Sequence, residues 1–264
     1  MTTFSELMAS ADRTEDQFSL AVPEDWLQGR TAYGGLSAAL SAHAAIAVFP
    51  DLPPLRSAQF TFVGPATGTL KVKPALLRRG KSTTFVQANI VGDDGPAVQV
   101  ILAFGARRAS VMGQAPARAP EATSWRSSPE FMSNGERPRH LTHFDSRLAG
   151  GSRLYSLDEP ARLLVWLRHD EESPPNTLPG LLALADALPP PALVLATERP
   201  PLSTITWAVD LFRDVRGDAS PSDHWLVEST ATSVMDGYST QDMAIWTADG
   251  APVLTARQNV AVFG

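Results

Sequence analysis

The sequence predicts an α+β fold of two similar units, in which two antiparallel sheets each wrap around a central helix. Two observations lead to this prediction. Each half of the chain contains a short apolar helix followed by four strand-like segments with turn residues between them. In addition, the turn segment at residues 94–98 matches the one at residues 249–253, at an offset of 155 residues. This self-similarity is typical of an internal duplication.

The composition limits the class of protein. The chain has 264 residues, 44% hydrophobic and 19% charged, so it can bury a sizeable core. A net charge of −6 argues against nucleic-acid binding, which normally needs a basic surface. The absence of cysteine excludes disulfides, thiolate catalysis and cysteine-based zinc sites. The five histidines show no clustered zinc spacing, so no metal is expected.

No targeting or membrane segment is expected. The N-terminus lacks the basic and apolar segments of a signal peptide. The longest apolar run, residues 34–49, is too short to span a bilayer. We therefore expect a cytoplasmic protein without a membrane span.

The first half is expected to contain one helix and a series of strands. Residues 1–16 are polar and predict a short lead-in, and residues 26–31 predict a loop. Small residues fill most faces of the helix predicted at residues 36–48, so it can lie very close to its neighbours. Strands are predicted at residues 17–22, 55–62, 68–77, 82–91 and 97–104. Asp94-Gly95 is a strong hairpin signal.

A linker and a second set of strands follow. Residues 106–138 are rich in Ser and Pro with little periodicity, and we interpret them as a linker between the units. His140 and His143 at its edge are expected to be exposed, and His224 is expected in a surface turn. Strands are predicted at residues 141–148, 161–168, 202–212, 225–235, 238–247 and 253–263.

One carboxylate lies inside the apolar helix of the second half. Pro179 suits the first turn of this helix, and the prolines from Pro189 onward stop it. The residues between them are apolar on every face, which predicts a helix that is buried all round. Asp186 lies near the C-terminal end, where the helix dipole disfavours negative charge, and a buried charge is costly unless it is paired or used. Asp186 is therefore the best pointer to function; the alternative is a carboxylate that caps a neighbouring loop.

Several short motifs occur in a specific order. They are Tyr33-Gly34-Gly35 before the first helix, Leu184-Ala-Asp-Ala-Leu188, Ser203-Thr-Ile-Thr-Trp207 and Thr255-Ala-Arg-Gln258. In this order they resemble the Phe-Gly-Gly turn, the Ser-Asp-Leu helix, the Ala-Thr-Ile-Asp strand and the last strand of the acyl-CoA thioesterase II family. The resemblance covers most of the chain outside the linker. It implies a double hot-dog fold, with an N-terminal hot-dog at residues 1–108, a linker at 109–138 and a C-terminal hot-dog at 139–264.

The resemblance implies a catalytic trio of Asp186, Thr204 and Gln258, which order and activate water in the family. The chemistry agrees, because thioester hydrolysis needs a base for water and donors for the developing oxyanion. A partly desolvated Asp is a stronger base, while Thr and Gln supply donors. Taken singly, Thr204 also fits an ordinary strand residue, and Gln258 fits a polar residue on a half-exposed strand.

Tyr33, Gly34 and Gly35 are the expected substrate-binding residues. A glycine turn at a helix N-terminus can present backbone N–H groups to a carbonyl, and the alternative is simple close packing. Three positions depart from the family pattern, and they concern contacts to the acyl chain and pantetheine more than the hydrolysis itself. These positions are Gln59, Gly64 and Ala66.

The function expected from the sequence is hydrolysis of acyl-CoA to a free acid and CoA. We expect a homo-oligomeric enzyme of lipid metabolism that uses no cofactor. One alternative is a non-catalytic double hot-dog protein that binds acyl-CoA or lipid, and the intact trio argues against it. A hydratase is disfavoured because Asp186 has no His shortly after it, and an α/β-hydrolase because the chain lacks a Gly-x-Ser-x-Gly motif.

Overall fold

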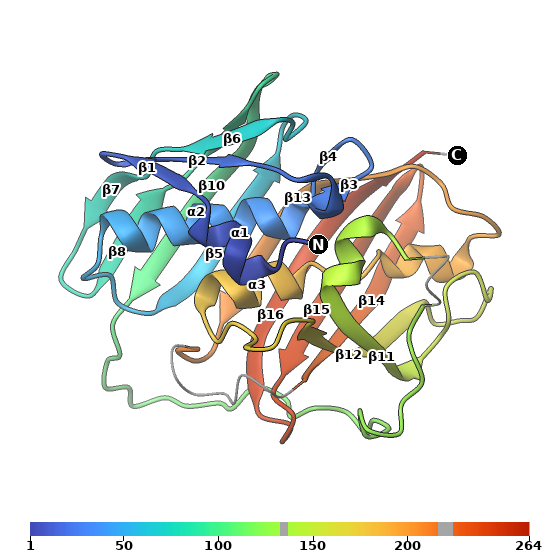
Figure 1. Cartoon of the computed structure of the whole chain (residues 1–264). Coiled ribbons are helices and arrows are strands. Elements are labelled where there is room, and N and C mark those ends of the chain that lie inside the picture. The colour runs from blue at the N-terminus through green and yellow to red at the C-terminus, as the bar shows by residue number, and fades with distance from the viewer. Residues whose placement is uncertain (133–136, 216–223, 264) are drawn as a thin grey trace.

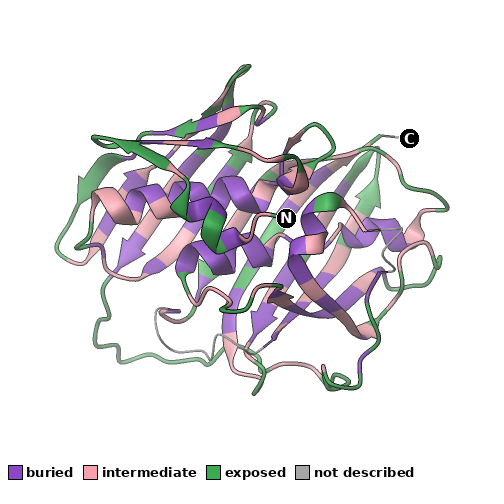
Figure 2. Cartoon of the chain, viewed as in Figure 1, coloured by how far each residue is buried: buried purple, intermediate pink, exposed green. Residues whose placement is uncertain are grey.

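Two buried helices lie in front of one large curved sheet (Figure 1). The computed structural model describes residues 1–132, 137–215 and 224–263. In this part of the chain, helix α2 (Gly34–Val48) packs against helix α3 (Leu178–Ala185). Both helices are buried along most of their length (Figure 2), so the core lies between them and the sheet.

A short helix, α1 (Phe4–Ala9), begins the chain where the sequence predicts only a polar lead-in. Thr3 and Glu6 form a reciprocal capping box, which satisfies backbone N–H groups at the start of this helix. Phe4, Leu7 and Met8 are buried. The lead-in prediction was wrong because three apolar residues among polar ones give little periodicity over one and a half turns.

The strands of the first half follow the predicted ones, with two of them divided. Three short strands were not predicted, and two of them pair across the segment at residues 26–31 that was predicted as a loop. Pro74 lies in the break of the segment predicted at residues 68–77, because proline cannot donate to a sheet ladder. The segment predicted at residues 82–91 is likewise two strands. The observed strands are β1 (Asp12–Thr14), β2 (Gln17–Ala21), β3 (Leu27–Gln28), β4 (Thr31–Ala32), β5 (Leu55–Phe62), β6 (Thr69–Val72), β7 (Ala75–Arg79), β8 (Thr83–Gln87), β9 (Ile90–Gly92) and β10 (Gly95–Gly105).

The second half has long strands joined by tight turns. Asp236 and Gly237 both have positive φ, as a two-residue hairpin turn requires, so this predicted turn is confirmed. The strands are β11 (Phe144–Gly151), β12 (Arg162–His169), β13 (Leu202–Leu211), β14 (Trp225–Met235), β15 (Tyr238–Trp246) and β16 (Pro252–Val262). Three-residue to five-residue 3₁₀ helices cover Glu24–Trp26, Arg139–His143 and Pro191–Leu195.

The two halves share one sheet rather than the two separate sheets that the sequence predicts. In the described residues this sheet has 14 strands, and β5 of the first half pairs antiparallel with β13 of the second. Phe60 and Trp207 lie opposite each other at this junction, with ring centroids 5.2 Å apart. The prediction of two sheets was wrong because pairing between strands about 150 residues apart leaves no local signal.

The order of strands agrees with the predicted duplication. From the central pair outward, β5 is followed by β10 on one side, and β13 is followed by β16 on the other. In each half, the central strand is the first long strand after the helix, and its neighbour is the last strand of that half. The halves are thus arranged symmetrically about the β5–β13 junction.

The predicted linker is irregular but is packed along the second half. Trp246 Nε1 donates to Ala117 O (2.9 Å), and Trp166 Nε1 donates to Thr123 O (2.7 Å). Both indoles belong to a small apolar cluster that Trp125 of this segment helps to cover. Part of the predicted linker, residues 133–136, lies outside the described residues. The contacts with the second half begin at Ala117, and residues 107–116 are exposed.

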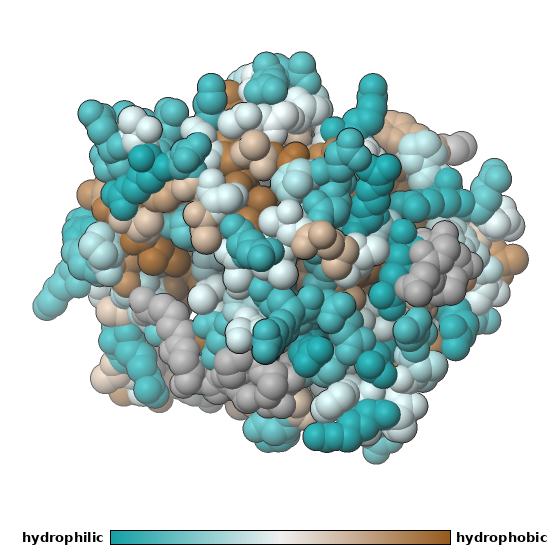
Figure 3. Space-filling model, viewed as in Figure 1, coloured by the Kyte–Doolittle hydropathy of each residue, from teal (hydrophilic) through white to brown (hydrophobic). Residues whose placement is uncertain are grey.

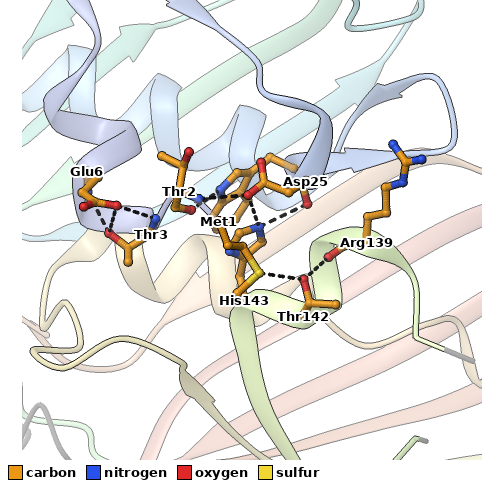
Figure 4. A network of polar contacts seen from close by, with 9 residues as sticks. Met1, Thr2, Thr3, Glu6, Asp25, Arg139, Thr142 and His143 are labelled. Atoms are coloured by element: carbon orange, nitrogen blue, oxygen red, sulfur yellow. Dashed lines mark hydrogen bonds and ion pairs between the residues drawn. The ribbon is translucent and has the colours of Figure 1, made fainter. Parts of the chain in front are cut away.

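Buried histidines join the N-terminal segment to the second half. His143 stacks on Trp26 with centroids 3.9 Å apart, and its Nε2 donates to the Asp25 carbonyl (3.1 Å). Thr2 N–H donates to the Asp25 carboxylate (2.9 Å), so Asp25 also binds the N-terminal segment (Figure 4). His140 is also buried. The prediction that His140 and His143 are exposed was therefore wrong, because aromatic residues far away in sequence cover them.

His224 is buried as well, against the prediction of a surface turn. It is 1% exposed, and its Nε2 lies 2.9 Å from the Asp145 carboxylate. Trp125 stacks on its ring. The residues just before it, 216–223, lie outside the described part of the chain.

The viewed face of the molecule is mainly hydrophilic, with hydrophobic patches between polar side chains (Figure 3). Among the described residues, no helix is both long enough and apolar enough to cross a membrane.

Candidate active site

A cleft of about 410 Å³ opens where the start of α2, the end of α3 and the strands β13 and β16 meet. Asp186, Thr204 and Gln258 all line it, so the structure brings the three predicted catalytic residues together. Gly34 and Ser37 line it from α2. Gly64, Pro65 and Ala66 also lie in its wall, whereas Gln59 is exposed on the opposite face of the sheet.

Helix α3 carries Asp186 into the centre of the molecule. Thr177 caps its N-terminus by accepting from Gly180 N–H (3.2 Å), and Pro179 lies in the first turn. All eight of its residues are buried, as predicted. The helix ends at Ala185, before the prolines, and Asp186 is its C-cap residue. The end of the helix therefore turns this carboxylate into the cleft.

Two hydrogen bonds hold the Asp186 carboxylate. Gln258 Nε2 donates to its Oδ1, and the backbone N–H of Gly35 donates to it from the first turn of α2. Burial raises the pKa of Asp186 to about 7, and these two hydrogen bonds act in the opposite direction because they favour the ionised form. Near neutral pH the carboxyl group therefore exists in both protonation states, which suits a group that accepts and returns a proton.

Two glycines allow α2 to approach α3 this closely. A Cβ at Gly34 would lie 2.7 Å from Asp186 Oδ2. A Cβ at Gly35 would lie 2.5 Å from Tyr33 Oη and 2.7 Å from the Ala183 carbonyl oxygen. Real Cβ atoms essentially never come this near, so both positions need glycine. Gly34 and Gly35 thus allow the close packing of α2 against α3. The other reading, N–H groups presented to a substrate carbonyl, stays a prediction.

Tyr33 lies beside the site without lining the cleft. It is 1% exposed, its hydroxyl donates to the Ala183 carbonyl, and its ring stacks on His140 with centroids 4.5 Å apart. Burial raises its pKa well above the ordinary value, with a smaller contribution from the Asp186 charge. Among the residues expected to bind substrate, Gly34 faces the cleft and Tyr33 holds the helices in place.

A β-bulge places Thr204 on the inner face of the sheet. Thr204 lies opposite Val260, but Thr206 lies opposite Asn259, so Ile205 is an extra residue in β13. Without this bulge, strict alternation from the buried Trp207 would put Ile205 and Ser203 inside and Thr204 outside. The sequence predicts Thr204 only through the family resemblance, because the bulge has no clear local signal.

Gln241 is a site residue that the sequence analysis missed. It is 1% exposed and donates through Nε2 to Gln258 Oε1 (2.8 Å). It lies directly opposite Gln258 in the β15–β16 pair. Residues 241 and 258 are equally distant from the Asp249-Gly250 turn, so a hairpin centred on that turn pairs them. The predicted turn was therefore sufficient to predict this contact.

A smaller cavity of about 40 Å³ also has Asp186 in its wall and adjoins the cleft. Leucine and proline side chains make up much of its wall, and His140, Tyr155 and Arg199 are its titratable neighbours. Burial, with smaller contributions from the charges of Arg199 and His143, lowers the pKa of His140 to about 3, so its ring is neutral near pH 7. Within the described residues, no three His, Cys, Asp or Glu side chains form a group that could hold a metal ion.

Solved structures of similar architecture define the class of protein. A hot-dog protein of unknown function from Alicyclobacillus acidocaldarius has a TM-score of 0.87 at 23% identity, covering 100% of this chain and 99% of its own. The TesB protein of Mycobacterium avium subsp. paratuberculosis has a TM-score of 0.79 at 18% identity, covering 99% and 100%. An acyl-CoA thioesterase II from Mycobacterium marinum has a TM-score of 0.72 at 16% identity, covering 97% of each chain. The protein is therefore a hot-dog protein.

Family models match both halves of the chain. Residues 22–105 match the N-terminal domain of acyl-CoA thioesterases, and residues 113–262 match the C-terminal domain. The chain thus belongs to the acyl-CoA thioesterase family and is a thioester hydrolase, as its motifs predict. A comparison with curated proteins finds no match.

Proposed function

We propose that this protein hydrolyses acyl-CoA thioesters with Asp186 as the base and with Thr204 and Gln258 as polar partners. The observation that carries this proposal is the position of Asp186. Its carboxylate lies in a cleft between apolar helices, accepts hydrogen bonds from Gln258 and Gly35, and has a pKa raised to about 7.

In the proposed reaction, the Asp186 carboxylate takes a proton from a water molecule whose oxygen bonds to the thioester carbonyl carbon. The carbonyl oxygen becomes an oxyanion, which needs hydrogen-bond donors. The carbon–sulfur bond then breaks, and the proton on Asp186 passes to the CoA sulfur. The products are a free carboxylic acid and CoA, and the carboxylate is regenerated.

In this proposal Thr204 and Gln258 form hydrogen bonds to water and substrate. The Thr204 hydroxyl is a donor and an acceptor on the wall of the cleft. Gln258 uses one N–H on Asp186, and its amide nitrogen carries a second N–H for water. Gly34 lies beside Asp186 in the same cleft and is the proposed contact for the thioester.

Release of free thiol from a panel of acyl-CoA esters tests the proposal. We expect turnover by the wild-type protein and at least a hundredfold loss in Asp186→Asn, which keeps the shape of the side chain but cannot act as a base. Asp242→Asn is the matched control, because Asp242 is exposed on the outer face and pairs with Arg257. Undiminished turnover in a folded Asp186→Asn protein would contradict the role of Asp186.

Cytoplasmic location, a role in lipid metabolism, homo-oligomer formation and the domain limits at residues 108 and 139 stay predictions. Light scattering on the purified protein measures its oligomeric state directly.

A further inference from the structure

We propose that Gln241 is a positioning residue, which holds the Gln258 amide with its nitrogen facing Asp186. This inference rests on the proposed function, because Gln241 acts through Gln258 and has no contact of its own with Asp186 among the hydrogen bonds of the described residues. It adds a fourth side chain to the proposed trio.

Gln241, Gln258 and Asp186 form a chain of hydrogen bonds in which every donor points toward Asp186. Gln241 and Gln258 lie opposite each other on β15 and β16, and both side chains are buried. Gln241 Nε2 donates to Gln258 Oε1 at 2.8 Å, and Gln258 Nε2 in turn donates to Asp186 Oδ1. Each amide therefore directs its NH₂ group toward the Asp186 carboxylate.

The direction matters because an amide has a donor on one side and an acceptor on the other. If the Gln258 amide turned by 180°, its oxygen would face the carboxylate oxygen of Asp186, and this arrangement favours the protonated acid. Gln241 opposes that rotation. Its NH₂ group would then meet the NH₂ group of Gln258, and two donors cannot form a hydrogen bond.

A second acceptor beside Gln241 favours the present orientation of its amide. The Met243 sulfur, a weak acceptor, lies 4.0 Å from Gln241 Nε2. Gln241 Oε1 is buried and has no hydrogen-bond partner among the described residues. An unpaired buried acceptor costs stability, so this amide is poorly explained by packing alone. Its placement is explained by the hydrogen bond that it gives to Gln258.

The other titratable groups near Asp186 must be considered when the pH profile is interpreted. Tyr33 faces it from the start of α2, and His140, Tyr155 and Arg199 lie across the smaller cavity. Burial keeps His140 neutral, with a pKa of about 3, and keeps Tyr33 protonated, with a pKa well above its ordinary value. The inward neighbours of Gln241 on its own strand, Ser239 and Met243, carry no charge.

The pH dependence of kcat/KM for thiol release between pH 5.5 and 9 tests the inference. In Gln241→Met, which keeps the length of the side chain but has no N–H, we expect the acid limb to move to higher pH by about 0.5–1 unit. Above the shifted limb, kcat should recover most of its wild-type value. A merely structural residue would lower activity at every pH and leave the position of the limb unchanged.

A double-mutant cycle provides the decisive comparison. Gln258→Met alone should shift the limb, and Gln241→Met in that background should add no further shift. Ser239→Ala is the control, because Ser239 is a buried inward residue of the same strand that does not line the cleft. Should Gln241→Met fold poorly, Gln241→Leu is also uncharged and lacks the donor, so it should shift the limb in the same direction.

The outcomes separate this inference from the proposed function. An unmoved limb in folded Gln241→Met, or an equal shift in the Gln258→Met background, would overturn the role of Gln241 while leaving that of Asp186 intact. Full activity of Asp186→Asn would overturn the proposed function itself.

Discussion

The hydroxyl of Tyr33 donates to the carbonyl oxygen of Ala183, 150 residues further along the chain. The last carbonyl groups of a helix have no partner inside it, and Ala183 lies in the final turn of α3. Tyr33 therefore caps α3 from the start of α2 and fixes the two helices against each other. The position of Asp186 depends on this contact, since Asp186 is the C-cap residue of α3, three residues after Ala183.

Gly35→Ala should destabilise the protein through this helix pair. The added Cβ would meet Tyr33 Oη and the backbone oxygen of Ala183, and backbone atoms cannot move away cheaply. We expect a loss of about 3 kcal/mol in the free energy of unfolding, measured in urea. Gly113→Ala, in open space, should stay within about 1 kcal/mol of the wild type. Equal stability of the two variants would contradict the close approach.

The rate of hydrolysis should follow the ionisation of Asp186. A base acts in its deprotonated form, and burial raises the pKa of this group to about 7. We therefore expect kcat/KM to fall about tenfold per pH unit below pH 7 and to level off above it. Initial rates with a short-chain acyl-CoA measure this profile. An acid limb near pH 4, where an ordinary Asp titrates, would argue against a desolvated base.

Thr204 and Thr206 offer a matched pair on the two faces of one strand. Thr204 lines the cleft, while Thr206 is exposed on the outer face. Thr204→Val should lower kcat about 10–100-fold because it removes a hydroxyl donor, and Thr204→Ser should retain most of the activity. Thr206→Val should leave kcat unchanged. Similar losses at both positions would indicate a general effect on β13 rather than a role in the site.

Acid should destabilise the fold through its buried histidines. Burial lowers the pKa of His140 to about 3 and of His169 to about 4, so the unfolded chain takes up protons first as the pH falls below about 6.5. Between pH 7.5 and 5 each should cost about 2 kcal/mol. Asp186 acts in the opposite sense, because its raised pKa lets the folded state bind a proton first and contributes about 2–3 kcal/mol over this range.

Urea unfolding of the wild type and of Asp186→Asn at pH 7.5 and pH 5 measures both contributions. The wild type should lose about 1–2 kcal/mol, and the variant, without the opposing carboxyl group, should lose about 4 kcal/mol. An acid loss in the variant no larger than in the wild type would contradict the raised pKa of Asp186.

Local signals predicted most elements of the fold. The alanine-rich run predicted α2, because alanine favours helix. The three Asp-Gly pairs lie at or beside the hairpin turns, and Asp236-Gly237 has the positive φ at both residues that such a turn requires. Helix α1 was missed although its capping box, Thr3 to Glu6, is visible in the sequence. The β5–β13 junction and the burial of His140 and His143 could not be predicted from local patterns, because contacts between distant segments of the chain determine them.

The candidate site was predicted in the same uneven way. Asp186 stood out from the residues alone, as a charge inside an apolar helix. Thr204 and Gln258 required the family resemblance, since a bulge at Ile205 reverses the expected face of Thr204. Gln241 could have been predicted by pairing residues outward from the predicted Asp249-Gly250 turn, but this step was not taken.

The shared sheet has a further consequence, which concerns evolution by duplication. In the β10–β5 pair, Val100 lies opposite Phe60, as Gln258 lies opposite Trp207 in the β16–β13 pair. Two identical chains would have to carry the same residue at both positions. Because one polypeptide contains both copies, the two positions can differ: the second half has an amide that lines the cleft, while the first half has an aliphatic side chain. A chain with two such halves can thus give them different roles, which a symmetric pair of identical chains could not.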